Sequence, residues 1–427
     1  MKNQSITEAM LQFIEESPTA FHAAANVEAL LLENGFEKLE NLAEGALVPG
    51  GSYYTMQNGS AVLAVKIPEN PAKGFRIAAS HSDSPCFKIK EVPEMKVENT
   101  YVKLNVEKYG GMILSPWLDR PLSVAGRVFV AGKDGKPEAK LVNLKKDLLI
   151  IPNVAIHFNR EINNGFAYNP QTDMAPLMGL DQELSIKKLC AEAAGVAEEE
   201  ILGSDLYVYN RDKGRIMGAD DSLIGSPRLD DLQCAYATLH GFLASKPEEF
   251  ISVYALFDNE EVGSGTKQGA DSTFLEEFLE IVLENVYPDK NRLWKRSFYQ
   301  NSFLLSADNG HAVHPNHPEK TDPTNRPYLN GGVVLKYNGS QKYTTDGYSA
   351  AIVRQICNTW EIPLQTFANR SDIAGGSTLG NISTAHVSIP GCGTGTAGHA
   401  FCIRDSGGEG YRSTGTAGRA FICVSFL

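Results

Sequence analysis

The chain has 427 residues, 42% of them hydrophobic, a length that exceeds what one compact core serves and predicts two domains. Its 39 Lys and Arg residues face 51 Asp and Glu residues, and the formal net charge of −12 argues against a nucleic-acid or anionic-membrane partner. No run approaches the roughly 20 apolar residues of a membrane span, and the first residues lack the apolar core of a signal peptide. Seven scattered cysteines signal neither a disulfide framework nor a thiolate zinc site. We therefore expect a soluble cytoplasmic protein.

The first half of the chain contains two regions with different secondary-structure patterns. Apolar residues recur at helical spacing over residues 18–35, and Asn58-Gly59 separates two β-rich runs as a hairpin turn would. The run "FRIAAS" then predicts a short buried strand. From about residue 93 to 225, successive short strands with Gly and Asp turns indicate an inserted, β-rich domain.

After residue 225, helical and strand patterns alternate to the end of "IPLQTFA" at Ala368. This alternation predicts an α/β sandwich with a mixed, largely parallel sheet. Residues 1–92 and 226–427 are expected to form this discontinuous domain, with residues 93–225 inserted between its halves.

Ligand-type side chains follow three of the predicted strands. "FRIAAS" runs into His81-Ser82-Asp83, "ISVYALF" into Asp258-Asn259-Glu260-Glu261, and "SFLLSA" into Asp308-Asn309-Gly310-His311, while Asp230-Asp231 opens a helix. In open α/β sheets, ligands bind beyond the carboxyl ends of the strands. Crowded carboxylates would repel one another there, and a divalent cation is the simplest way to keep them ionised.

Each of these residues alone has an ordinary structural explanation. A single Asp or Glu after a strand is commonly a loop cap, and adjacent glutamates are common on exposed helices. The complete set favours a metal site with one carboxylate to spare. Neighbouring side chains of a strand point in opposite directions, so Glu260 and Glu261 need a bend to face one cavity.

The spare carboxylate has a chemical use. Water on a bound metal is acidified to a pKa of roughly 7, and a neighbouring carboxylate can take its proton and pass it to a leaving amine. Two metals about 3.5 to 4 Å apart, bridged by one Asp, would clamp the nucleophile and the oxyanion. Mixed His and carboxylate ligation suits Zn²⁺, with Mn²⁺ or Co²⁺ as alternatives.

Five motifs resemble, in order and spacing, those of the aspartyl aminopeptidase family of co-catalytic metallopeptidases. They are "SHSDSPCFKIK", "SPRLDDL", "FDNEEVGS", "SADNGHAVHPN" and "GGSTLGNIS", and the resemblance extends from about residue 5 to 390. It implies a zinc aminopeptidase with two metals per subunit. His81 and Asp308 would hold one metal, Asp230 would bridge, and Glu261 would bind the second.

The resemblance also implies the roles of other residues. Glu260 would be the general base, and Asp83 would orient His81. In "IPNVAIHFNRE", His157 would reach the active site of a neighbouring subunit, so that the inserted domain would be a dimerisation domain within a large homo-oligomer. His311 and His314 match family residues but are expected to be structural.

Peptides with a free N-terminus are the implied substrates. The family's eukaryotic members prefer acidic first residues, and Lys336 and Lys342 are candidate partners for an acidic side chain. Two alternatives stay open: a non-catalytic subunit that keeps the fold and assembly surface, and a metal-dependent amide deacylase, which would not need a free amine.

The resemblance stops at Pro390. The family continues into a segment with Met-His-Ser, whose histidine completes the second metal, and then a helix, whereas this chain reads "GCGTGTAGHAFCIRDSGGEG". With plausible codons, reading one base later turns residues 391–404 into Asp-Val-Gly-Leu-Ala-Gln-Pro-Gly-Met-His-Ser-Ala-Tyr-Glu. This match suggests a one-base frameshift near codon 391, the alternative being a divergent tail. His399 is not an obvious substitute ligand, because its surroundings lack the family's strand-to-helix context.

Overall fold

The computed structural model describes residues 5–40, 47–373, 391–396, 401–403 and 420–425. The chain forms two compact units. Unit 1 holds the described residues of Met1–Glu16, Ala23–Asp83 and Gly214–Ser425, and unit 2 those of Ser17–His22 and Ser84–Lys213. No helix in the described ranges is both long and apolar enough to cross a membrane.

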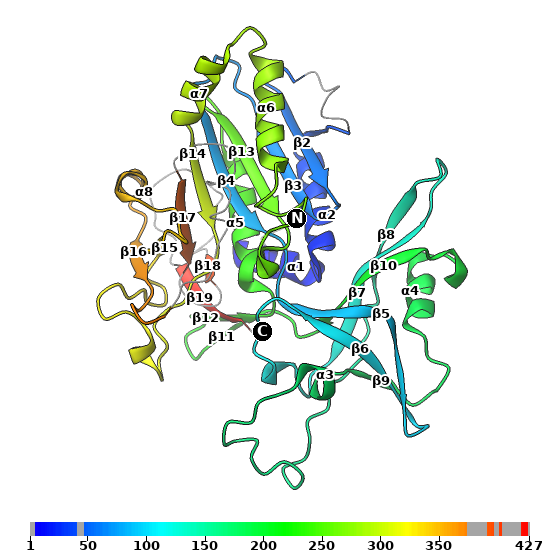
Figure 1. The fold of residues 1–427 in the computed structure, drawn as a ribbon. Coiled ribbons are helices and arrows are strands. Elements are labelled where there is room, and N and C mark those ends of the chain that lie inside the picture. Colours follow the sequence, from blue (N-terminus) through cyan, green and yellow to red (C-terminus); the bar gives the residue numbers. More distant parts are fainter. Residues whose placement is uncertain (1–4, 41–46, 374–390, 397–400, 404–419, 426–427) are drawn as a thin grey trace. The chain divides into compact units, whose positions relative to one another are not determined.

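A nine-stranded mixed sheet is the centre of unit 1 (Figure 1). Parallel pairs outnumber antiparallel ones, as the alternating pattern predicted. In spatial order its strands are β1 (Glu37–Lys38), β2 (Ser52–Gln57), β3 (Ala61–Lys66), β13 (Ile251–Phe257), β4 (Phe75–His81), β14 (Phe303–Ala307), β17 (Gly391–Thr396), β15 (Val333–Tyr337) and β16 (Leu364–Ala368).

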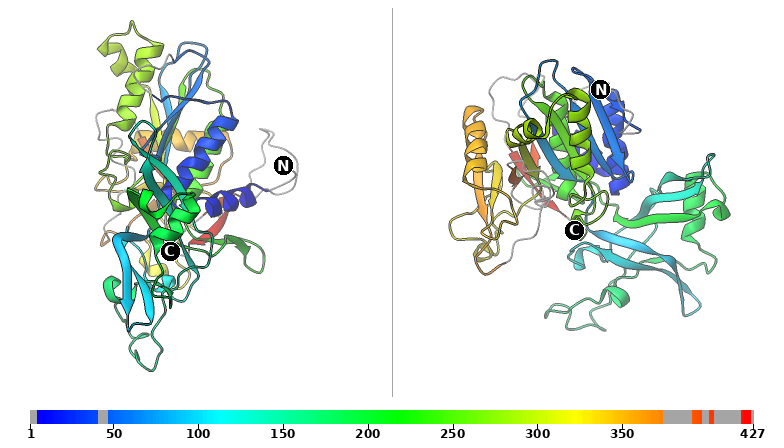
Figure 2. Two further views of the ribbon diagram at one scale, coloured as in Figure 1. Left: turned by 90° about the vertical axis from the view of Figure 1, so that its right-hand side faces the viewer. Right: turned by 45° about the horizontal axis from the view of Figure 1, so that its top comes forward.

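Helices cover both faces of this sheet, which confirms the α/β sandwich. On one face lie α6 (Phe274–Val286) and α7 (Arg292–Gln300), and on the other α1 (Ile6–Glu16), α2 (Ala20–Glu33) and α5 (Leu229–Ala244). The left view of Figure 2 shows the blue N-terminal helices and the yellow-green α6 on opposite sides of the strands.

Residue alternation along the strands explains this layering. Val253, Ala255 and Phe257 pack in the core beneath α6, whereas Tyr254 and Leu256 pack in the core beneath α5. Successive strand side chains point to opposite faces, so a strand covered on both sides reads as a continuous apolar run. "ISVYALF" is such a run, and β13 begins and ends as its pattern predicts.

The Asn58-Gly59 turn joins β2 and β3 as an antiparallel hairpin, with Gln57 opposite Ala61. Both turn residues have positive φ, 56° for Asn58 and 65° for Gly59. Asn and Gly tolerate this conformation better than other residues, which is why the dipeptide predicted the hairpin.

Unit 2 is built on a six-stranded sheet, in accordance with the short strands that its sequence pattern predicted. Phe87 and Trp117 pack edge to face in its core, with ring centroids 5.1 Å apart. In spatial order the strands are β8 (Pro137–Asn143), β7 (Leu122–Ala131), β10 (Gly203–Asn210), β5 (Cys86–Val97), β6 (Tyr101–Tyr109) and β9 (Leu177–Gly179), accompanied by helices α3 (Pro170–Asp173) and α4 (Ile186–Ala194).

The remaining elements belong to unit 1. Helix α8 (Gly347–Thr359) packs against β15, and a four-stranded sheet contains β11 (Arg215–Met217), β12 (Leu223–Ser226), β19 (Ala420–Ser425) and β18 (Phe401–Ile403). Helices α1 and α7 were not predicted from the sequence. The sequence pattern also placed the domain boundaries at residues 92/93 and 225/226, whereas the units divide after Asp83 and before Gly214, because β5 pairs with strands of unit 2 and β11 with β12.

Candidate metal centre

Three adjacent parallel strands end at the same edge of the large sheet. In β13 and β4, Phe257 is opposite His81, and β14 pairs with the other side of β4 up to Ser306 opposite Ala79. The chain segments that follow therefore meet beyond this edge. They carry the His81–Asp83, Asp258–Glu261 and Asp308 groups that the sequence analysis singled out.

A metal-ligand cluster, consisting of His81, Asp230, Asp231 and Asp308, is located there. Each residue offers one ligand atom, and these four atoms lie within 4.8 Å of one another. His81 Nε2 is 3.6 Å from an Asp230 oxygen and 3.9 Å from an oxygen of both Asp231 and Asp308. His81 and Asp231 are fully buried.

The start of α5 explains how two consecutive aspartates reach one cluster. Asp230 and Asp231 have non-helical backbone angles, with ψ values of 109° and 19°. In a regular helix their side chains would diverge by about 100°. The family resemblance implied a ligand role for Asp230 only, and the adjacent Asp-Asp pair at the helix start was the available signal for Asp231.

Asp83 connects His81 to the segment with the two glutamates. One oxygen, Oδ1, is 3.2 Å from His81 Nδ1 and accepts from the Glu260 backbone N–H at 3.2 Å, and Oδ2 accepts from the Glu261 N–H at 3.1 Å. Such a carboxylate fixes the ring orientation of a ligating histidine and leaves Nε2 for the metal.

The bend that Glu260 and Glu261 require is present. Asn259 adopts a left-handed conformation with φ of 61°, and the chain continues into a 3₁₀ turn, Glu260–Val262. An oxygen of Glu260 lies 4.0 Å from His81 Nε2. Glu261 is not one of the four residues of the metal-ligand cluster.

Burial shifts the protonation of these acids. Loss of hydration, together with the neighbouring Asp308, raises the pKa of Asp230 to about 7. Burial also raises the pKa of Glu260 to about 7 and that of Glu261 to about 9, because His81 offsets the penalty only in part. Without a cation, burial therefore favours the protonated, neutral form of these carboxyl groups.

Asp308 behaves differently because of Lys336. Burial alone would raise its pKa, but Lys336 and His81 hold the pKa of Asp308 below its usual value. Lys336 Nζ lies 3.3 Å from Asp308 Oδ2, and the lysine is 3% exposed.

The pKa of His81 is also shifted. Burial would lower the pKa of His81, but Asp231 and Asp308 raise it well above its usual value.

These residues fit a zinc site. One imidazole and several carboxylates converge there, and Lys336 forms its ion pair with Asp308. A divalent cation between the carboxylates would remove their mutual repulsion and suits the mixed nitrogen and oxygen donors.

The predicted histidines have different surroundings. His157 lies in an exposed turn of unit 2, and its role in a neighbouring subunit stays a prediction. His314 Nδ1 accepts from the Asn316 N–H at 3.2 Å, and neither His314 nor His311 belongs to the metal-ligand cluster. His399 lies outside the described residues.

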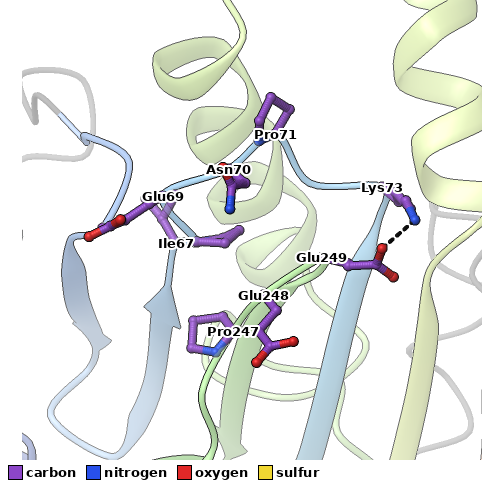
Figure 3. A pocket seen from close by; sticks show the side chains of 10 residues that line it. Ile67, Glu69, Asn70, Pro71, Lys73, Pro247, Glu248 and Glu249 are labelled. Carbon is purple, nitrogen blue, oxygen red and sulfur yellow. Dashed lines mark hydrogen bonds and ion pairs between the residues drawn. The ribbon is translucent and has the colours of Figure 1, made fainter.

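A separate surface pocket lies at the other end of the strands (Figure 3). Most of its residues directly precede β4 and β13, whereas the cluster lies at the carboxyl ends of these strands. Lys73 forms an ion pair with Glu249 at 2.5 Å in this pocket. None of the predicted site residues lines this pocket.

Comparison with known proteins identifies the protein's relatives. The family model described as aminopeptidase I zinc metalloprotease (M18) matches residues 13–405. This chain belongs to the M18 family. The match shows a zinc metalloaminopeptidase, a hydrolase, and extends past Pro390, where the five-motif resemblance stopped.

Curated M18 relatives match most of their own length. A probable M18 family aminopeptidase 2 of Clostridium acetobutylicum is 44% identical over 91% of this chain and 92% of its own. The protein of the same description from Pseudomonas putida is 37% identical over 90% of each chain.

Solved structures of other proteins share the fold. A chain in the cryo-EM structure of the Ape4 and Nbr1 complex has a TM-score of 0.86 and 31% identity, covering 91% of this chain and 79% of its own. The S. cerevisiae mApe1 dodecamer has a TM-score of 0.80 and 24% identity over 92% and 90%.

Proposed function

We propose that this M18 aminopeptidase releases N-terminal residues from peptides with Glu260 as the general base. The observation that supports the proposal is the position of Glu260, whose carboxylate lies 4.0 Å from His81 Nε2 at the edge of the metal-ligand cluster. Zinc, when bound, would polarise the scissile carbonyl and acidify water.

His81, Asp230 and Asp308, with Asp231 beside them, would hold the zinc, and Glu261 is proposed for a second ion. Glu260 would accept a proton from the attacking water and deliver it to the leaving amine, which suits a carboxyl group whose pKa is raised to about 7. Asp83 would keep both His81 and the Glu260 backbone in place through its two oxygens.

Replacing Glu260 by Gln tests this role. We expect Glu260→Gln to retain zinc while kcat falls roughly 100-fold or more, because the amide cannot accept the proton. Zinc content and hydrolysis of an aminoacyl anilide are measured in parallel in the chain restored by one base near codon 391. Glu261→Gln is the matched comparison, which should lose the second zinc. The reverse result, zinc loss in Glu260→Gln with normal zinc in Glu261→Gln, would exchange the two roles.

A preference for acidic first residues is a finer part of the proposal. Lys336 is a buried cation beside the cluster, and its ring neighbour Tyr343 lies 5.6 Å from Nζ. A cation next to the reacting groups would attract a substrate carboxylate and discriminate against neutral side chains. Lys342, the other candidate, is exposed.

The ratio of kcat/KM for an N-terminal Asp substrate over a Leu substrate tests this preference. Lys336→Met should lower the ratio by roughly tenfold or more, and Lys342→Met should leave it unchanged. The ratio is informative even if Lys336→Met also weakens zinc, because zinc loss reduces both rates equally. An unchanged ratio in Lys336→Met would refute the role of this lysine.

We also propose that the chain self-assembles through unit 2. Three apolar side chains flank His157 in the sequence, and each is at least half exposed: Val154, Ile156 and Phe158, the last at 87%. Exposed apolar side chains gathered in one loop are typical of a protein interface.

A further inference from the structure

Asn309 is a buried residue to which neither the motifs nor the proposed mechanism assigns a role. It directly follows Asp308, and it is 8% exposed. Its side-chain amide donates from Nδ2 to the Leu229 carbonyl at 2.8 Å, which spans 80 residues of sequence. Leu229 immediately precedes the Asp230-Asp231 pair of the metal-ligand cluster.

Two further contacts hold Asn309. The Cys234 thiol donates to Asn309 Oδ1 at 3.8 Å from the next turn of α5, and Lys336 Nζ donates to the Asn309 carbonyl at 2.8 Å. The same Lys336 Nζ lies 3.3 Å from Asp308 Oδ2. Asn309 is thus bonded to the beginning of α5 on one side and to β15 on the other.

From these bonds we propose that Asn309 is a positioning residue that sets the distance between Asp308 and the Asp230-Asp231 pair. Asp308 lies after β14 and the pair opens α5, so the two groups of ligands come from separate elements. The Asn309 amide joins them through two side-chain bonds. A metal site requires its ligands at a fixed separation before the ion binds, and groups that orient ligands contribute to affinity.

The residues that bond to the Asn309 side chain are buried. Leu229 is fully buried and Cys234 is 4% exposed, so water cannot readily replace the Asn309 amide. An apolar side chain of similar size would leave the Leu229 carbonyl without this donor. The start of α5 would then shift relative to Asp308, because backbone groups buried without a partner move to find one.

The test is zinc affinity in the full chain, measured by competition with a fluorescent zinc chelator. Asn309→Leu should weaken the tightest zinc by about 10 to 100-fold, the range expected for residues that orient metal ligands. Asn26→Leu is the matched control, because Asn26 Nδ2 also donates to a main-chain carbonyl, that of Glu16 at 3.0 Å, but from α2, which supplies no cluster ligand. Its zinc affinity should stay within about twofold.

The Cys234 contact supplies a second pair of variants. Cys234 also forms a side-chain hydrogen bond with Asp231. Cys234→Ser keeps a donor at this position and should keep zinc affinity, whereas Cys234→Ala removes the contacts with both Asn309 Oδ1 and Asp231 and should reduce it. The Co²⁺ absorption spectrum of the cobalt-loaded protein should change in Asn309→Leu and Cys234→Ala but not in Asn26→Leu. General destabilisation would not produce this pattern of spectral changes. The stability of each variant is measured separately, by thermal melting of the chelated proteins.

This inference rests on the zinc centre and does not depend on Glu260 as the base or on the substrate. Normal zinc affinity and an unchanged cobalt spectrum in Asn309→Leu would overturn it, whatever the peptidase activity. Equal losses in Asn309→Leu and Asn26→Leu would also overturn it, because they would indicate a general effect on the fold.

Discussion

At the scale of single residues, the metal centre combines groups that would repel one another without a cation. His81 is surrounded by the oxygens of Asp230, Asp231, Asp308 and Glu260 at 3.6 to 4.0 Å. Lys336 compensates Asp308, which keeps that acid ionised, whereas burial favours the neutral form of the others. The same arrangement therefore makes the protein receptive to zinc and sensitive to its removal.

Zinc removal should make stability depend on pH in a defined direction. The folded-state pKa values of Asp230 and Glu260, about 7, and of Glu261, about 9, exceed their ordinary values near 4. Between pH 4 and 7, and up to 9 for Glu261, the folded state binds more protons than the unfolded state. The stability of the chelated protein should therefore fall as pH rises through this window.

The raised pKa of His81 acts in the same direction, because the stabilisation it gives is present at low pH and is lost as pH rises through its folded-state value. Thermal melting in EDTA from pH 5 to 9 checks the trend. Glu261→Gln should flatten the curve above pH 7. Added zinc should restore stability most at high pH, since its ligands bind when deprotonated. A melting temperature that rises with pH in EDTA would contradict these assignments.

At the scale of elements, the ends of β4, β13 and β14 bring the ligands together, while α5 adds the remaining two. Strand β17 lies between β14 and β15 in the same sheet and contains the first residues after Pro390. The pairings of β17 use main-chain groups, which any non-proline sequence can supply. This pairing would therefore form with either reading of the tail.

A tail restored by one base near codon 391 should change metal content. The restored reading contains Met-His-Ser, which by family resemblance supplies an imidazole for the second ion, whereas the present chain leaves that ion to Asp230 and Glu261. We expect about one zinc per subunit in the present chain and two in the restored one, with faster peptide hydrolysis. Elemental analysis gives the zinc content of both proteins, and anilide hydrolysis gives their turnover. Two zinc ions per subunit and equal turnover in the unrestored chain would show that the tail provides its own ligand.

At the scale of the whole molecule, the M18 fold separates the chemistry from the proposed assembly surface. Unit 1 contains the four residues of the metal-ligand cluster, and unit 2 contains the exposed loop around His157. If His157 completes a neighbour's site, activity depends on assembly, even though the four residues of the metal-ligand cluster belong to one chain.

Subunit mixing tests this dependence. His157→Phe should lose activity with zinc content unchanged, and mixing it with inactive Glu260→Gln subunits should restore part of the activity, since some sites then receive an intact Glu260 and a partner's intact histidine. The exposed His317→Phe serves as the control substitution and should stay active. If verified mixed oligomers show no recovery, each site is built from a single subunit.

Local patterns in the sequence determined a large part of this fold. The continuous apolar run of Ile251–Phe257 requires cover on both faces, and Asn58-Gly59 adopts the positive φ values that a tight hairpin needs. The placement of acids after strand ends was sufficient to predict the site's position, because parallel strands end at a common edge. These features depend on residues near one another in the chain.

Only the tertiary structure decided which of those acids meet. Asp231 joins His81 because the backbone at the start of α5 leaves helical geometry, and Lys336 reaches Asp308 from β15, 28 residues away. Asn309 reaches the Leu229 carbonyl across 80 residues. Such contacts follow from how sheets and helices pack, and their energies depend on burial, so the sequence indicated candidate residues but not which of them meet.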